Sequence, residues 1–349
     1  AFATPYAAGA IHPHSVSADN LNQLFGDSQA VFELLRKEGT MGIRTHRHYD
    51  VFETPEEQPG FSSLLNNFQV HEPGDDIPKR QEGDIATAFS YDMLFAQMPF
   101  YLSRLFALYE ETGGTIHQQR LDRNDLLDTE GVLVNCSGYM GKQLFDDDRP
   151  FKAVRGHLVH VETERLPRED DGSYSSYNYV PDRSRLDNLG EGNTAYCFPR
   201  SDLIALGGTH QEGDPVNDEG YGPEGTQETV RIDDTEVPEH ILALNRELLK
   251  EWKGIDISDC RKRACIGYRP VRDLEGEGIR IELVEDRSAP VLHNYGQGGS
   301  GITLSWGSAL QSARLLQDEI EPSGNQQHGR GQYGIINPLR NQIQELLVS

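Results

Sequence analysis

The sequence predicts an α/β protein of two domains, the second an α+β domain with a sheet of its own. Three observations support this prediction. Segments with helical apolar periodicity alternate with short β-prone runs, as in folds built on parallel strands. A length of 349 residues exceeds what one compact core normally needs. Finally, a strand, a glycine-rich turn and a helix follow one another over residues 289–320.

The first half of the chain alternates between helical and extended patterns. Apolar residues at helical spacing, with glycines after two of the segments, predict helices at residues 17–39, 61–69 and 98–112. Alternating or β-prone residues predict strands at residues 42–53, 87–91 and 115–119.

The second half continues the alternation. The apolar run GVLVNC at residues 131–136 is typical of a buried parallel strand. Further strands are predicted at residues 154–163, 195–198, 203–207 and 289–295, the middle two as a hairpin, and helices at 238–252 and 302–320. Residues 169–193 are loop-rich, and the acidic segment 212–236 lacks periodicity, which predicts an insertion or a lid.

Composition narrows the range of partners and locations. The formal net charge of −24 argues against nucleic acid and against anionic membrane surfaces as partners. No apolar run approaches the roughly 20 residues of a membrane span. The chain shows no signal peptide and no SKL ending, so a cytoplasmic location is expected. The four cysteines are scattered, which indicates free thiols in a reducing compartment.

The glycine-rich turn contains a literal G-x-G-x-x-G, formed by Gly296, Gly298 and Gly301. A turn of this kind between a strand and a helix lets backbone approach a ligand closely and presents the positive end of the helix dipole. The pattern alone is weak, because it recurs in HGRGQYG at residues 328–334, where no strand precedes it and Pro338 interrupts any helix. That second match is interpreted as a coincidence.

The surroundings of the first match make it informative. Four segments occur in order along the chain: FATPYAAGAIHP, VNCSGYMGKQLFDDDRPFKAVRGH, TAYCFPRSDLIALGGTHQEGD, and GYRPVRD followed by HNYGQGGSGITLSWGSAL. Together they resemble the signature segments of the D-amino-acid oxidase and D-aspartate oxidase family of FAD-dependent oxidoreductases. The resemblance covers most of the chain.

The resemblance implies a D-amino-acid-oxidase-like fold in which the cofactor domain is discontinuous. It assigns residues 1–14, 115–160 and 256–349 to the FAD domain, and residues 15–114 and 161–255 to the substrate domain. Family members begin with a βαβ unit that holds the FAD diphosphate. This chain starts at the equivalent of the FATP stretch, so an incomplete Rossmann-type domain is expected. A homodimer or a second chain completing the sheet is expected with it.

Two residues are implied to hold the substrate. Arg269, in GYRPVR, matches the family arginine that binds the α-carboxylate, and Tyr196 matches the tyrosine that hydrogen-bonds the same group. From the residues alone, a structural ion pair and a core tyrosine are the alternatives. Arg272 is interpreted as structural. Gly192 stands where part of the family has a second tyrosine, so the resemblance leaves the substrate side chain open.

His12 is the third residue implied at the catalytic site, where it contacts substrate or a water, or is structural. The pairs His12/His14 and His46/His48 lack an identifiable third ligand, so no metal site is predicted. The residues implied to contact the flavin are Ala8, Gly9, Ala10, Gly138, Gly298, Gly299, Gly301, Ile302 and Thr303.

The resemblance implies FAD-dependent oxidation of an amino acid, with a D-amino acid as the expected substrate and O2 as electron acceptor. The products would be a 2-oxo acid, ammonia and hydrogen peroxide. Arg200 and His210 are candidates to bind an acidic side chain, or face solvent. The alternative is a cofactor-free pseudoenzyme or binding protein on the same fold.

Overall fold

A computed structural model describes residues 4–13, 16–123, 125–126, 131–185, 193–213, 221, 228–272, 278–285 and 290–320. The chain divides into two compact units. Unit 1 comprises Ala1–Ala10, Arg44–Met98 and Lys152–Arg269, and unit 2 comprises Ile11–Ile43, Pro99–Phe151 and Pro270–Ser349. The sequence analysis placed residues 15–43 and 99–114 in the substrate domain, whereas this division puts them with the C-terminal segment. Gly192 and the second glycine motif lie outside the described residues.

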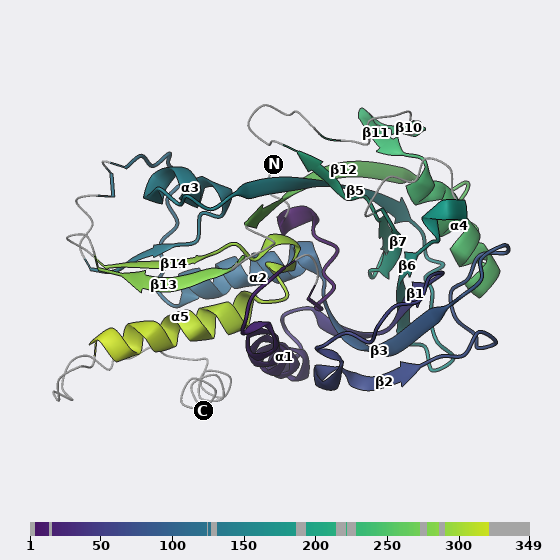
Figure 1. The fold of residues 1–349 in the computed structure, drawn as a ribbon, viewed down its shortest axis with the longest axis horizontal. Helices are drawn as coiled ribbons and strands as arrows, with labels where there is room; N and C mark the ends of the chain where they lie inside the picture. Colours follow the sequence, from purple (N-terminus) through teal and green to yellow (C-terminus); the bar gives the residue numbers. More distant parts are fainter. Residues whose placement is uncertain are drawn as a thin grey trace. The chain divides into compact units, whose positions relative to one another are not determined.

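The described residues of unit 1 are built on a nine-stranded sheet (Figure 1). Its order is β12-β5-β8-β7-β6-β1-β3-β2, and β9 also pairs with β5. The strands are β1 (Ile43–Phe52), β2 (Asn66–Val70), β3 (Thr87–Ala96), β5 (Phe151–Glu162), β6 (Tyr174–Val180), β7 (Ala195–Pro199), β8 (Leu203–Gly207), β9 (Gln211–Gly213) and β12 (Lys262–Arg272). A short hairpin of β10 (Thr229–Ile232) and β11 (Thr235–Pro238) is separate from it.

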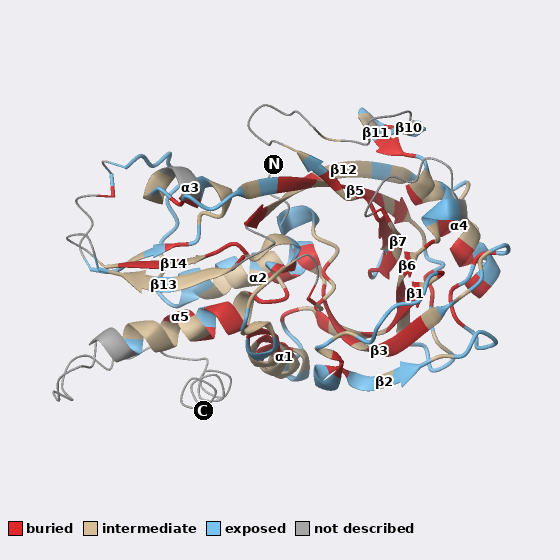
Figure 2. Cartoon of the chain, viewed as in Figure 1, coloured by how far each residue is buried: buried red, intermediate tan, exposed pale blue. Residues whose placement is uncertain are grey.

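One face of this sheet packs against α4 (His240–Lys253). In Figure 2, red along β6 and β7 marks their buried residues. The helix contributes Ile241, Leu244, Leu248 and Trp252 to the core, and the sheet contributes alternate residues such as Val159, Tyr177 and Leu206. Side chains alternate between faces along a strand. The neighbouring residues, including Tyr196 and Phe198 of β7, therefore lie on the opposite face.

Unit 2 combines helices with a three-stranded sheet of order β13-β14-β4. Its elements are α1 (Leu21–Glu38), α2 (Met98–Glu111), β4 (Leu133–Asn135), α3 (Tyr139–Phe145), β13 (Arg280–Val284), β14 (Val291–Tyr295) and α5 (Ser305–Ile320). Gly307 of α5 fits tightly against α1: its N–H donates to Ser28 Oγ at 2.8 Å, and a Cβ there would collide with the Leu24 carbonyl. Trp306 Nε1 donates to Tyr101 of α2 at 2.9 Å.

Most of the strongly periodic segments form the predicted elements, including the helices that became α1, α2, α4 and α5 and the hairpin of β7 and β8. The helix predicted at 61–69 is wrong. The chain forms a 3-10 turn at Ser62–Leu64 and then β2, which pairs antiparallel with β3. The strand predicted at 115–119 does not form. The parallel strand predicted at residues 131–136 forms as β4, which pairs with β14, but its Val134 is 47% exposed rather than buried.

Candidate functional site

Arg269 and Tyr196 approach each other across two intervening strands of the unit 1 sheet. Arg269 lies on β12 and Tyr196 on β7, with β5 and β8 between them. The two side chains nevertheless approach each other, and the charge of the Arg269 guanidinium acts on the Tyr196 phenol. Each must therefore lie along the face of the sheet rather than stand upright from it.

Two glycines provide the space for this arrangement. A Cβ on Gly156 of β5 would lie 2.6 Å from Nη2 of Arg269, and a Cβ on Gly207 of β8 would collide with the ring and hydroxyl of Tyr196. Gly207 is directly paired with Tyr196 in the sheet. The sequence analysis did not identify either glycine as a site residue. Both stand in segments quoted for the family resemblance, VRGH and LGG, and that was the available signal.

The charge of Arg269 is not neutralised by a carboxylate among the residues that the structure describes. Burial raises the pKa of the Tyr196 phenol above its ordinary value, and the nearby charges of Arg269 and Arg200 only partly offset this effect. Tyr196 therefore remains protonated at neutral pH and can donate a hydrogen bond. The pair presents a cationic fork and a neutral hydroxyl, which together suit a carboxylate.

Residues 4–10, here called the strap, run past the end of β3. Ala96 N–H donates to the Gly9 carbonyl at 2.8 Å, and Ala10 forms an isolated bridge with Phe95. Gly9 has φ +99°, and a Cβ there would collide with the Ala96 carbonyl oxygen. Glycine is thus required at this position for close approach, as well as for its backbone conformation.

The predicted strand, glycine turn and helix are present in unit 2 as β14, a 3-10 turn at Gly298–Ser300, and α5. Gly296 has φ +94°, and a Cβ there would collide with the Gly278 carbonyl. Gly299 and Gly301 are exposed, and no atom lies within 4 Å of the position that a Cβ on Gly301 would take. The turn therefore leaves accessible backbone just before a helix N-terminus, where N–H groups lack helical partners.

Two other residues of unit 2, Thr303 and Gly138, were also predicted to contact the flavin. Thr303 Oγ1 donates to the His12 carbonyl at 3.0 Å, which joins the segment around His12 to the residues before α5. Gly138, with φ +59°, ends the connection from β4 and precedes α3. The nearest neighbour of a Cβ on Gly138 would be Pro270 Cγ at 4.0 Å, so its surroundings are also open.

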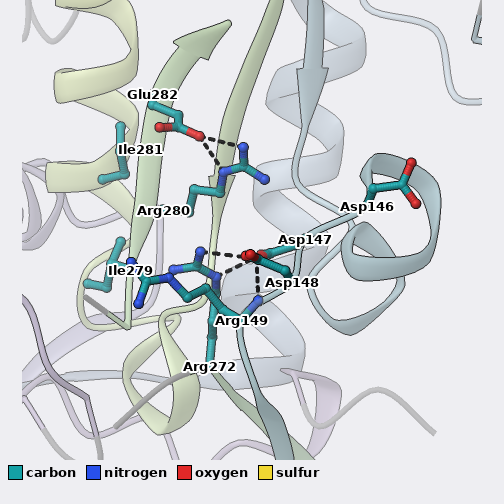
Figure 3. A pocket seen from close by; sticks show the side chains of 9 residues that line it. All are labelled: Asp146, Asp147, Asp148, Arg149, Arg272, Ile279, Arg280, Ile281 and Glu282. Atoms are coloured by element: carbon teal, nitrogen blue, oxygen red, sulfur yellow. Dashed lines mark hydrogen bonds and ion pairs between the residues drawn. The ribbon is translucent and has the colours of Figure 1, made fainter. Parts of the chain in front are cut away.

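A polar cavity of about 320 Å³ lies elsewhere in unit 2, beside Arg272 (Figure 3). Arg272 Nε donates to Asp147 Oδ2 at 2.7 Å, and Tyr295 OH donates to the same oxygen at 2.6 Å. Arg280 on the cavity wall is paired with Glu282. Arg272 and Arg280 thus have acidic partners, which supports the structural interpretation of Arg272.

The two histidines of β1 are buried on one face. His46 stacks on Phe95, and His48 Nδ1 lies 2.9 Å from Ser176 Oγ. Within the described ranges, no group of three or more His, Cys, Asp or Glu side chains is placed to hold a metal ion. A search of the same ranges finds no helix with the length and apolar character of a membrane span.

Comparison with known proteins agrees with the signature segments. The sequence profile of the DAO family, described as FAD dependent oxidoreductase, matches residues 3–315. A D-amino-acid oxidase of Dictyostelium discoideum is 28% identical over 283 residues, which are 80% of this chain and 69% of that protein. The D-aspartate oxidase of Homo sapiens is 25% identical over 331 residues, or 89% and 82% of the two chains.

Solved structures share the fold at low sequence identity. The glycine oxidase of Geobacillus kaustophilus superposes with a TM-score of 0.61 at 15% identity, covering 94% of this chain and 87% of that one. The L-proline dehydrogenase of P. horikoshii gives a TM-score of 0.63 at 12% identity, covering 91% and 84%. At these identities the likeness concerns the fold alone.

Proposed function

The chain belongs to the DAO family of FAD dependent oxidoreductases, and on this premise we propose that it oxidises a D-amino acid to the 2-oxo acid. The balanced reaction consumes the amino acid, O2 and water, and yields the 2-oxo acid, ammonia and hydrogen peroxide. The names of the two relatives, a D-amino-acid oxidase and a D-aspartate oxidase, support the D configuration.

The observation that carries this proposal is the Arg269–Tyr196 pair laid over Gly156 and Gly207. An amino acid presents a carboxylate whatever its side chain, and a guanidinium fork with an adjacent hydroxyl binds that group in a fixed orientation. A structural arginine would be expected to have an acidic partner. Arg269 has no such partner in the part of the chain that the structure describes, so its charge is available to a ligand.

The glycine turn of unit 2 fits the polar edge of a flavin ring. Accessible backbone at Gly299 and Gly301, open space at Gly301 and the positive end of α5 suit the carbonyl oxygens at the edge of a flat ring. Gly298, Ile302 and Thr303 would complete this contact, and Ala8, Gly9, Ala10 and Gly138 are the further residues proposed to hold FAD. Bound FAD would supply the two-electron acceptance that amino acid oxidation needs, with O2 as the final acceptor.

The chain's own residues would bind and orient the substrate. Arg269 and Tyr196 hold the carboxylate, and the Cα–H bond is broken as the substrate loses two electrons. The resulting imino acid is hydrolysed by water to the 2-oxo acid and ammonia. The Tyr196 phenol stays protonated at neutral pH and a guanidinium has no acceptor atom, so neither acts as a base and the substrate ammonium loses its proton to solvent. His12 is a further residue that we propose to be catalytic, through contact with substrate or an ordered water.

Absorbance spectroscopy tests the proposal directly. The purified protein is mixed with FAD, desalted, and titrated under anaerobic conditions with the D and L forms of several amino acids. We expect a retained flavin band that a D-amino acid bleaches and its L form does not. Absence of retained flavin would contradict the cofactor assignment, and a flavin that no amino acid bleaches would contradict the proposed reaction.

A further inference from the structure

The ring of Tyr196 packs against a phenylalanine two residues further along β7. The ring centroids of Tyr196 and Phe198 lie 5.2 Å apart, with an angle of 45° between the planes. Tyr196 is partly exposed, whereas Phe198 is buried. Residues two apart in a strand point to the same face of the sheet, so Phe198 lies beside Tyr196 and away from solvent. The position of the Tyr196 ring therefore depends on what holds Phe198.

Phe198 in turn stacks on a buried histidine from another strand. The ring centroids of His48 and Phe198 lie 5.7 Å apart, and the two planes differ by only 11°. His48 belongs to β1, and β6 lies between β1 and β7 in the sheet (Figure 1). The residue of β6 that pairs with His48 is Ser176, whose small side chain leaves room for the two rings to meet. A row of side chains thus crosses the sheet from β1 to Tyr196.

Both ring nitrogens of His48 have hydrogen-bond partners. Nδ1 lies 2.9 Å from Ser176 Oγ, and Nε2 lies 3.3 Å from Asp50 Oδ1. The other oxygen of Asp50 accepts a hydrogen bond from Tyr91 OH at 2.9 Å. A carboxylate only accepts, so Nε2 donates to Asp50 and the neutral ring accepts from the serine hydroxyl at Nδ1. All four side chains are buried. The plane of His48 is therefore fixed by groups from β1, β3 and β6.

A second histidine of β1 provides a contrast on the same face. His46 is also fully buried and stacks on Phe95, with centroids 4.2 Å apart and an angle of 14°. Phe95 also packs against Phe198, at 6.2 Å. Among the described residues, however, neither ring nitrogen of His46 has a hydrogen-bond partner. His46 contributes a flat surface, whereas His48 connects the stacked rings to a hydrogen-bonded network.

Building on the proposed function, we infer that His48 is a positioning residue for that reaction. Held by Ser176 and Asp50, it orients Phe198 and, through Phe198, the Tyr196 hydroxyl that would bind the substrate carboxylate. The competing explanation is that the His48 network only stabilises the sheet. A purely structural role would act whether or not Tyr196 carries its hydroxyl, so removal of that hydroxyl distinguishes the two.

A double-mutant cycle of His48→Phe and Tyr196→Phe makes this comparison in the FAD-loaded protein. His48→Phe keeps a flat ring but loses both hydrogen bonds, and it should lower kcat/KM about 10-fold for the D-amino acid that the wild type oxidises fastest. The physical reason is that small displacements of a binding group have costs of this size. In the Tyr196→Phe background the same replacement should cost less than about twofold, because the hydroxyl that His48 positions is already absent. Equal losses in both backgrounds would overturn the positioning role.

Two further variants are the controls. His46→Phe is the same replacement on the same strand and face, but it removes no hydrogen bond, and kcat/KM should stay within about twofold of the wild type. Asn245→Ala removes a buried side chain of α4 that accepts from Tyr177 OH at 2.8 Å, on the opposite face. It should lower the thermal midpoint and leave kcat/KM unchanged. A loss in either control as large as that in His48→Phe would overturn the inference.

Ser176→Ala keeps the experiment decisive if His48→Phe does not fold. It removes one of the two anchors of His48 and leaves the imidazole and Asp50 in place. We expect a loss in kcat/KM of about threefold that disappears in the Tyr196→Phe background. A loss that persists there would contradict the positioning role.

A binding measurement separates this inference from the proposed reaction. D-Lactate carries the carboxylate of an amino acid but no amino group, and isothermal titration of the same variants gives its Kd. Coupling between His48 and Tyr196 in D-lactate binding, without oxidation of any amino acid, would support the positioning role and contradict the reaction. Independent effects of the two residues, with oxidation intact, would overturn the positioning role alone. A wild type that does not bind D-lactate would overturn both the carboxylate site and the positioning role.

Discussion

Two arginines of β12, three residues apart, have opposite surroundings. Arg269 lies over a glycine, near a neutral phenol and without a carboxylate partner in the described part of the chain. Arg272 is inserted between acidic and aromatic groups: Asp147 accepts from its Nε at 2.7 Å and from Tyr295 OH at 2.6 Å. The chemistry of the two side chains is the same, so the difference lies in what the fold places beside each.

The comparison shows how a counter-charge separates structural from functional cations. Asp147 is almost fully buried and also accepts a hydrogen bond from the backbone N–H of Arg149 at 3.1 Å. Arg272 and Asp147 thus satisfy each other inside unit 2, as buried ion pairs must. Arg269 is left with unused binding capacity, which a ligand carboxylate would fill.

Replacing Arg269 is the change expected to have the largest effect. Arg269→Met should lower kcat/KM for amino acid oxidation roughly 10³-fold, because two charge-assisted hydrogen bonds to the carboxylate are lost. The thermal midpoint should change little, since no buried acid is left unpaired. Steady-state kinetics and thermal denaturation of the same preparation measure both quantities.

The matched variant at Arg272 should show the reverse pattern. Arg272→Met leaves Asp147 charged, buried and without its cation, which typically destabilises a protein by about 3–5 kcal/mol. Below its thermal midpoint, the folded fraction should retain near-normal kcat. A stable Arg272 variant with lost activity, or an unstable Arg269 variant with normal activity, would invert the assignment of the two arginines.

The two arginines also show which features of the site the sequence predicts and which it does not. GYRPVR identified Arg269 and Arg272 by motif, yet the strand that carries them was not predicted, because KRACIGYRPVR shows neither clear alternation nor an apolar run. β6, which is rich in serine and tyrosine, was missed for a related reason. Strand formation depends strongly on cross-strand packing, and these strands are specified by their neighbours in the sheet.

The residues of the candidate site also divide into those that local sequence patterns predict and those that depend on distant parts of the chain. Local patterns sufficed for the turn at Gly296–Gly301, where strand, glycines and helix are consecutive. They did not suffice for Gly156 and Gly207, whose role depends on side chains from other strands. The partner of Arg272 is 125 residues away in sequence, so no local pattern predicts it. Long-range packing therefore decided which residues around each arginine matter.

Replacing Gly207 tests the space beneath Tyr196 in the Arg269–Tyr196 pair, and we expect an effect of intermediate size. The backbone of Gly207 is not in the left-handed region, so alanine is tolerated there except for its contact with Tyr196. Gly207→Ala should push the phenol away from Arg269 and lower kcat/KM about 10- to 100-fold, since a displacement near 1 Å at a site has that cost. The measurement is steady-state kinetics with a D-amino acid.

The control for this variant is Gly60→Ala, another glycine of unit 1. No atom lies within 4 Å of a Cβ at Gly60, and its φ is also ordinary. Its kinetics should match the wild type. If both variants behave like the wild type, the Tyr196 ring has room to move and Gly207 is not needed to position it.

The smallest expected effect is a loss of folding stability at acid pH that depends on the Arg272–Asp147 ion pair. Burial alone would raise the pKa of Asp147, but hydrogen bonds from Arg272 and Tyr295 outweigh it and lower the pKa to about 2, from an ordinary 3.8. A carboxylate with a lowered folded pKa contributes stability above its unfolded pKa and loses that contribution as pH falls. The free energy of unfolding should therefore decrease between about pH 4 and pH 2 as Asp147 takes up a proton.

Urea denaturation across this range measures the slope of the unfolding free energy against pH. The slope should be shallower for Asp147→Asn than for the wild type, while Arg269→Met keeps the wild-type slope. Equal slopes for Asp147→Asn and the wild type would mean that the ion pair does not govern acid stability, and the contrast between the two arginines would then rest on activity alone.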